Sequence, residues 1–209
     1  MYASVEDLRA EGVTTTMASN ERTSALLAES SALIDRVTGW WFEPRNATLR
    51  LYGRDTPSIE PPVPPLRLNA LLVGDEPVSV AEDVEVVGAP VAPFDDFRIT
   101  RRHGRLFPRD REIVAIGLWG FTEADGTPLG RTPLAIRRAT LLLTIRCLPK
   151  LADADGMAAR SSWRLLEEKT RDQSYRLQPL ATPSLALTMD PEVDQILARY
   201  RRPAGLGAA

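Results

Sequence analysis

The fold of this chain is decided by the stretch Leu33-Ile34-Asp35-Arg36-Val37-Thr38-Gly39-Trp40-Trp41-Phe42-Glu43-Pro44-Arg45, because the spacing of apolar residues changes within it. Before it, apolar residues recur on one helical face from a start at Ser19-Asn20, and this helix ends near Thr38-Gly39. From Phe42 to about Phe121, short alternating runs are separated by proline and glycine, which is typical of strands. The sequence therefore predicts an α+β fold.

Further helices are predicted on both sides of the β-rich region. Ser4-Val5-Glu6-Asp7 has the spacing of a capping box and Gly12 follows as a stop, so residues 4–11 are expected to form a short helix. Thr132-Pro133 predicts a cap and a first-turn proline, which open a helix that runs to about Leu148. Two more helices are expected over residues 162–173 and 190–200. We expect the helices to pack into a small bundle that forms the core.

The β-rich region is expected to form a small antiparallel sheet or sandwich inserted between the helices. His103-Gly104 is the tight turn of an expected hairpin. The expected strands are residues 47–52, 66–73, 84–87, 97–100, 105–107 and 112–118. This order predicts four parts of the chain: N-terminal core helices in 1–46, a β-rich insertion in 47–121, C-terminal core helices in 122–178, and an extended arm with a docking helix in 179–209.

The C-terminal helix is amphipathic and short. Asp190 is suited to cap it and Pro191 to its first position, while Val193, Ile196, Leu197 and Tyr200 fall on one stripe. A helix of about ten residues is marginal alone in water, so the stripe needs a surface to pack on. The extended segment before it and the glycine-containing end after it suit a tethered helix that docks on another chain. Packing on its own domain is the alternative.

The helix from Thr132 to Leu148 has two apolar faces. One face carries Leu134, Leu141, Ile145 and Leu148, and the opposite face carries Ile136, Leu143 and Cys147. A helix that is apolar on both faces is buried on both. It lies either at the centre of the core, or between the core and a neighbouring subunit.

Composition excludes several classes of protein. The 209 residues include one cysteine and one histidine, which excludes an internal disulfide and the usual Cys/His zinc sites. A net charge of -2 argues against a dedicated nucleic-acid binder. No run approaches the roughly 18 apolar residues of a membrane span, and the N-terminal residues lack the pattern of a signal peptide. We expect a protein of the reducing cytosol, or of a particle assembled there.

The sequence also lacks the residue groups of an enzyme. Cys147 lies on an apolar helix face, where a thiol is usually an inert small hydrophobe. His103 lies among arginines with no carboxylate partner in the sequence around it. The segment Asp153-Ala154-Asp155-Gly156 lacks two ligands of a calcium loop, and no glycine-rich phosphate loop is present. We predict no catalytic residue, no metal site and no cofactor.

The basic hairpin tip is the candidate contact with a polyanion. It carries Arg101, Arg102 and Arg105 around the His103-Gly104 turn. Such a tip suits a polyanion or an acidic partner, and a charged exposed hairpin without a partner is the alternative.

Several motifs occur in an order that is informative as a whole. In the N-terminal half these are Tyr2-Ala3-Ser4-Val5-Glu6-Asp7-Leu8, then Leu33-Ile34-Asp35-Arg36-Val37-Thr38-Gly39, then Phe42-Glu43-Pro44-Arg45. In the C-terminal half these are Gly117-Leu118-Trp119-Gly120-Phe121, then Pro133-Leu134-Ala135-Ile136-Arg137-Arg138-Ala139, then Asp190-Pro191-Glu192-Val193-Asp194 to Tyr200-Arg201-Arg202-Pro203. In this order the chain resembles the head-to-tail connector adaptors of tailed bacteriophages over nearly its whole length.

The resemblance implies a structural protein of the virion neck, assembled in the host cytoplasm and located between capsid and tail. Its protomers would form a ring under the portal protein, typically a dodecamer, whose lumen continues the DNA channel towards a stopper or tail-terminator protein. DNA would make only transient, non-specific contact, and no membrane is involved. We expect the free protein to be monomeric and to form rings on the portal.

The resemblance also suggests roles for particular residues. Portal binding would fall to the C-terminal helix and its basic end: Val193, Ile196, Leu197, Arg199, Tyr200, Arg201 and Arg202. Ile136, Leu143 and Cys147 would lie at the subunit interface, and Arg101, Arg102 and Arg105 would contact DNA or another neck protein. Two alternatives remain open: a stopper or tail-completion protein of the same neck, and a small cytosolic ligand-binding protein or enzyme.

Overall fold

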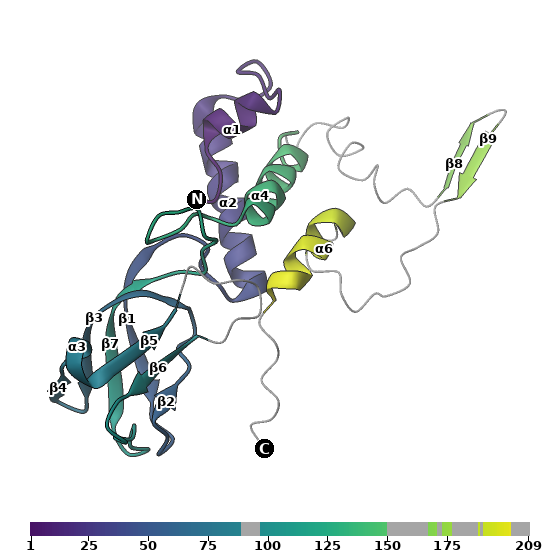
Figure 1. Ribbon diagram of the computed structural model, residues 1–209. Helices are drawn as coiled ribbons and strands as arrows, with labels where there is room; N and C mark the ends of the chain where they lie inside the picture. Colours follow the sequence, from purple (N-terminus) through teal and green to yellow (C-terminus); the bar gives the residue numbers. More distant parts are fainter. Residues whose placement is uncertain (89–96, 150–166, 171–172, 177–187, 189, 202–209) are drawn as a thin grey trace.

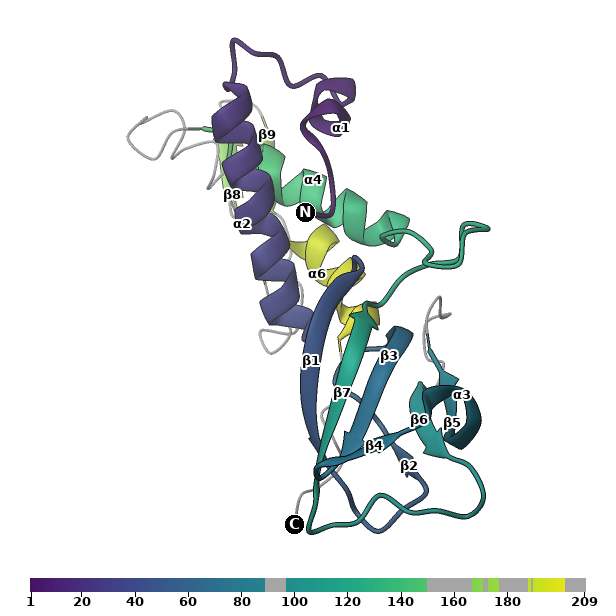
Figure 2. The ribbon, with the colours of Figure 1, turned by 90° about the vertical axis from the view of Figure 1, so that its left-hand side faces the viewer.

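The computed structural model of the chain describes residues 1–88, 97–149, 167–170, 173–176, 188 and 190–201 (Figure 1). Its helical body contains α1 (Val5–Ala10), α2 (Asn20–Thr38), α4 (Leu134–Arg146) and α6 (Pro191–Tyr200). The other described elements are mostly antiparallel strands, and Figure 2 shows that the strands between Arg45 and Trp119 lie at the opposite end of the molecule from the helical body. The predicted α+β fold class is confirmed.

Helices α1 and α2 begin and end where the sequence signals predict. The Ser4 hydroxyl accepts a hydrogen bond from the Asp7 N–H (3.1 Å), and the Asp7 carboxylate accepts one from the Ser4 N–H (2.9 Å), which completes the capping box of α1. Ser19 caps α2, and Gly39 ends it in the left-handed region at φ 76°. Local hydrogen bonding at these ends accounts for the accuracy of the sequence signals.

The strands between Arg45 and Trp119 form two antiparallel sheets that pack face to face. The four-stranded sheet has the order β1-β7-β3-β4, and the three-stranded sheet has the order β2-β6-β5. The elements are β1 (Arg45–Tyr52), β2 (Ser58–Ile59), β3 (Pro65–Val73), β4 (Glu76–Val78), the short helix α3 (Val80–Asp83), β5 (Val84–Val87), β6 (Arg98–Arg101) and β7 (Glu112–Trp119). Ile99, Ile113 and Trp119 are fully buried in the core shared by both sheets.

Aromatic side chains join the helical body to the sandwich. Phe42, at the junction of α2 and β1, is fully buried and meets the Phe121 ring at a centroid distance of 5.8 Å. Tyr200 of α6 meets the Phe42 and Phe121 rings edge-on, at 5.5 Å and 5.8 Å. Tyr2 also meets the Phe42 ring edge-on, at a centroid distance of 5.6 Å. Four segments that are distant in the sequence therefore converge on one aromatic cluster.

A polar network lies beside this aromatic cluster. The Tyr2 hydroxyl donates to the Asp35 carboxylate and accepts from the Phe42 N–H (3.1 Å), and Arg45 pairs with Asp35 (2.8 Å) and Glu43 (3.1 Å). Burial, together with the hydrogen bond to Asp35, raises the pKa of Tyr2 far above its ordinary value. Tyr2 is therefore a neutral donor, and the network joins the start of the chain to the junction of α2 and β1.

Three expectations about local structure were wrong. Residues 105–107 form no strand, and Phe107 instead makes an isolated bridge to Thr56.

The helix expected over 162–173 is contradicted by an antiparallel hairpin of β8 (Glu167–Thr170) and β9 (Gln173–Arg176), while residues 162–166 lie outside the described part. Residues 167–173 carry no apolar residue, so a helix there would have no stripe to bury. Thr132 does not cap α4, because its hydroxyl donates to the Phe42 carbonyl (2.8 Å).

Asp7 links α1 to α4 and makes stability depend on pH. It forms an ion pair with Arg137 of α4. Burial acts to raise the pKa of Asp7, but the hydrogen bonds from Ser4 and Arg137 outweigh it and hold the pKa below its usual range. The pKa of Asp7 is lower in the folded state than in the unfolded state. Asp7 therefore makes its full contribution to stability at pH values above its unfolded pKa, and this contribution is lost as the pH falls through its folded pKa.

We therefore expect the free energy of unfolding to decrease as the pH is lowered below about 4. Asp7→Asn should lower the urea unfolding midpoint at neutral pH and flatten its change at acidic pH. Urea unfolding at several pH values measures both effects. Asp110→Asn is the control, because Asp110 is exposed and far from any described helix in the sequence. An Asp7→Asn profile that parallels the wild type would contradict the prediction.

Candidate assembly surfaces

Helix α6 packs on its own chain, across α2 and α4. Val193 and Leu197 are fully buried, in a cluster with Ile136, Ala139 and Leu143 of α4, among other residues. Ile196 and Tyr200 are partly buried against the same cluster. The stripe that was expected to dock on a portal is therefore covered by the protein's own helices. Val193 and Leu197, predicted as portal anchors, have no accessible surface in this arrangement and offer none to a partner while α6 is packed here.

Charged groups hold the beginning of α6 in place. One Asp190 carboxylate oxygen accepts from the N–H groups of Glu192 (3.0 Å) and Val193 (3.3 Å), and the other forms an ion pair with Arg146 of α4. Glu192 pairs with Arg138 (2.8 Å). Asp190 is buried and its charge is compensated by the guanidinium group, so the pair orients α6 on the body.

The basic end of α6 remains accessible. Arg199 and Arg201 are exposed, and neither has an ion-pair partner within the described part of the chain. Arg202 lies outside the described residues. The C-terminal half of α6 therefore presents guanidinium groups beside the half-buried Ile196 and Tyr200.

Helix α4 packs on both sides within one molecule, although Leu134 and Ile145 of its second face are exposed (50% and 36%). Ile136 and Leu143 pack towards α2 and α6 in the core. Leu141 and Leu148 pack on the cluster that includes Leu8 of α1. The core therefore covers most of the two-faced helix, and Ile136, predicted at a subunit interface, has no accessible surface for one. Leu143 and Cys147 reach the surface in a hollow, so their place at a subunit interface stays a prediction.

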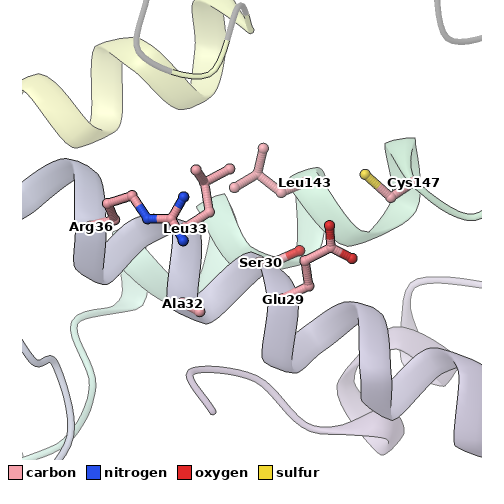
Figure 3. A pocket seen from close by; sticks show the side chains of 7 residues that line it. All are labelled: Glu29, Ser30, Ala32, Leu33, Arg36, Leu143 and Cys147. Carbon is pink, nitrogen blue, oxygen red and sulfur yellow. The ribbon is translucent and has the colours of Figure 1, made fainter.

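A hollow of about 220 Å³ lies between α2 and α4 and includes the accessible part of Cys147 (Figure 3). It is lined by Glu29, Ser30, Ala32, Leu33, Arg36, Leu143 and Cys147. A hydrogen bond joins the two helices here: the Thr144 hydroxyl of α4 donates to the Ser30 hydroxyl of α2 (3.1 Å). Leu143 and Cys147 were predicted at a surface from the sequence, but the contribution of α2 was not, although Glu29, Leu33 and Arg36 recur at the spacing of one helix face.

The basic tip is partly neutralised by the sandwich. Arg105 pairs with Asp83 of α3 (3.5 Å), and the Arg102 guanidinium donates to the Ala81 carbonyl (3.5 Å). Arg101 lies over the Phe107 ring at 5.9 Å and donates to the Leu106 carbonyl (3.2 Å). His103 and Gly104 both have positive φ, as a tight turn requires. Contact of this tip with DNA or a neck protein remains a prediction.

Metal-binding clusters and membrane-spanning helices were sought in the described part of the chain. No cluster of three or more His, Cys, Asp or Glu side chains in it is placed to hold a metal ion. None of its helices is long and apolar enough to cross a bilayer.

Comparison with solved structures finds chains that share the fold of this protein over nearly its whole length. No protein-family model and no curated protein sequence matches this chain. Among solved structures, a chain from the neck of an empty gene transfer agent particle aligns with a TM-score of 0.57 at 17% identity, over 99% of this chain and 92% of that one. The likeness is one of fold. A chain from the virion of the native gene transfer agent particle aligns with a TM-score of 0.52 at 16% identity, over 91% of this chain and 81% of that one.

Proposed function

We propose that this protein is a structural component of the neck of a phage-like particle, where it acts as a head-to-tail connector adaptor. The observation that carries the proposal is the likeness to a gene transfer agent neck chain over 99% of this chain and 92% of that one. A structural similarity that covers both the helices and the sandwich is less expected by chance than a single shared motif. The order of sequence motifs, which resembles phage adaptors, points independently to the same class.

The proposed adaptor forms a ring under the portal and continues the DNA channel towards the tail. The neck that contains the similar chain was computed with C6 symmetry, and the proposed ring of twelve copies is compatible with that symmetry. The near-neutral net charge suits a channel that must let DNA pass without retaining it. No enzymatic activity is proposed.

The exposed basic end of α6 is the proposed portal contact. Val193 and Leu197 hold the helix on the body, and Arg199, Arg201 and Arg202 face acidic groups of the portal beside Ile196 and Tyr200. In this arrangement α6 is already ordered before it binds, which lowers the entropic cost of association.

We expect the double variant Arg199→Glu and Arg201→Glu to co-sediment with portal rings of the same particle about tenfold more weakly than the wild type. Charge reversal replaces attraction with repulsion at the rim, and the fold is unaffected because both side chains are exposed. The matched control reverses two exposed arginines of the sandwich, Arg54 and Arg67.

The outcomes of this co-sedimentation experiment distinguish an error in the proposed portal-binding site from an error in the proposed adaptor function. Equal binding of both double variants would exclude the end of α6 as the portal surface. Failure of the wild type to bind portal rings, with binding to a preformed neck, would assign the protein as a stopper or tail-completion protein instead.

A further inference from the structure

The loop of residues 122–131, between β7 and α4, is held rigidly by its own hydrogen bonds. Glu123 and Arg131 exchange two backbone hydrogen bonds (both 2.9 Å), and their side chains form an ion pair (2.8 Å). The Thr122 hydroxyl donates to the Leu129 carbonyl (2.7 Å), and the Gly130 N–H donates to the Thr127 hydroxyl (3.1 Å). A loop fixed in this way loses little entropy when it binds.

The tip of this loop presents an apolar side chain beside a carboxylate. Leu129 is 38% exposed although its carbonyl is fixed. The Asp125 carboxylate accepts from the hydroxyl (2.6 Å) and the N–H (2.9 Å) of Thr127, and these bonds hold the pKa of Asp125 below its usual range. Asp125 is thus ionised and oriented, and Leu129 is displayed without cover in the described part of the molecule.

The hollow between α2 and α4 has the complementary chemistry. Leu33, Leu143 and Cys147 line it with apolar surface. Glu29 and Arg36 lie about 10 Å apart along α2, given the rise of a helix, so opposite charges flank this surface. Neither charge has an ion-pair partner among the residues that the structure describes.

The loop and the hollow lie on different sides of the helical body, so they cannot meet within one molecule. Figure 3 shows that the hollow opens on the side of the α2–α4 pair where α6 lies. In Figure 1 the loop between β7 and α4 lies on the other side of α2 from α6. Two complementary surfaces at different places on one molecule make a head-to-tail contact, which closes into a ring when the rotation permits.

We infer that the 122–131 loop of one copy docks into the α2–α4 hollow of the next copy, with Leu129 on the apolar floor and Asp125 against Arg36. The occupant is a second copy of this chain, because the loop supplies an apolar side chain for the floor of the hollow and a carboxylate for Arg36, which is unpaired among the described residues. The inference rests on the proposed neck ring and specifies how its protomers contact one another.

Cross-linking to the native Cys147 tests the contact directly. Leu129→Cys is oxidised in the full-length protein at about millimolar concentration and in the portal-bound complex, and Met17→Cys is the control for random collision because Met17 is 60% exposed. We expect Leu129→Cys to cross-link at least about tenfold faster, since docking raises the effective thiol concentration. The products should form a ladder beyond the dimer, because the contact is head-to-tail. Adding Cys147→Ser should leave dimers at most.

A double-mutant cycle tests the charge pair. Asp125→Asn removes the charge but retains an amide oxygen that can accept from Thr127. Asp125→Asn and Arg36→Gln are each expected to slow the Leu129→Cys cross-link, and the combined variant should be no slower than either. Additive losses would overturn the pairing of Asp125 with Arg36.

Portal binding by the same variants separates this contact from the proposed function. If Leu129→Cys binds the portal but cross-links no faster than Met17→Cys in either preparation, the loop contact is wrong and the neck function stands. A Cys147-dependent ladder without any portal binding would support the contact and overturn the adaptor role.

Discussion

Leu197→Ala should destabilise the protein by about 2–5 kcal/mol, the range for truncating a fully buried leucine. Leu197 has no accessible surface and packs in the cluster formed by α2, α4 and α6. The change removes apolar contacts and leaves a cavity that the neighbouring helices fill only in part. Urea unfolding followed by circular dichroism measures the loss in free energy.

Ile196→Ala is the matched control, because Ile196 lies next to Leu197 on the same helix but is only partly buried. We expect it to cost roughly half as much or less. Equal unfolding midpoints for Leu197→Ala and the wild type would mean that α6 is not packed on its own body in solution. The stripe of Val193 and Leu197 would then be free to dock on another chain.

Phe42→Ala should destabilise the protein by about 3–5 kcal/mol. Phe42 is fully buried and meets the rings of Tyr2, Phe121 and Tyr200. Its loss removes the contact surface that the first residues, the sandwich and α6 share. Because edge-on aromatic pairs contribute beyond their buried area, Phe42→Leu should recover only part of the lost free energy.

The Phe42→Ala measurement is urea unfolding with circular dichroism and tryptophan fluorescence as separate probes. We expect the two transitions of the variant to occur at lower urea concentration than in the wild type. Trp41→Leu is the control, since Trp41 is also at the junction but only partly buried against the sandwich core. A loss for Phe42→Ala no larger than that for Trp41→Leu would contradict the central role of the aromatic cluster.

Local signals predicted much of the secondary structure. The capping box at Ser4 and Asp7, the glycine after α2 and the Asp190-Pro191 start of α6 all act through neighbours in the sequence. The long strands β1, β3 and β7 followed from alternation, because their inward residues must be apolar. Short elements such as β4 and α3 carry too few residues for a pattern and were missed.

The candidate assembly surfaces were only partly predictable. The basic end of α6 was found from sequence because charge next to an amphipathic helix is visible in the chain. Glu29 and Arg36 were missed because they are ordinary polar residues of a helix until α4 creates a hollow between them. Asp125 and Leu129 were missed because the loop is organised by side-chain to backbone hydrogen bonds that have no periodicity.

The sequence by itself determined the α+β class, most helix ends and which faces are apolar, since these depend on caps and periods within a few residues. Tertiary structure alone decided what covers each apolar face. Periodicity shows that the stripe of Val193 and Leu197 and both faces of α4 need burial, but it does not name the partner. In the folded chain α2 and α4 cover the stripe of α6, while α1, α2 and α6 cover α4 except at Leu134 and Ile145, because these surfaces are brought together at no cost of association.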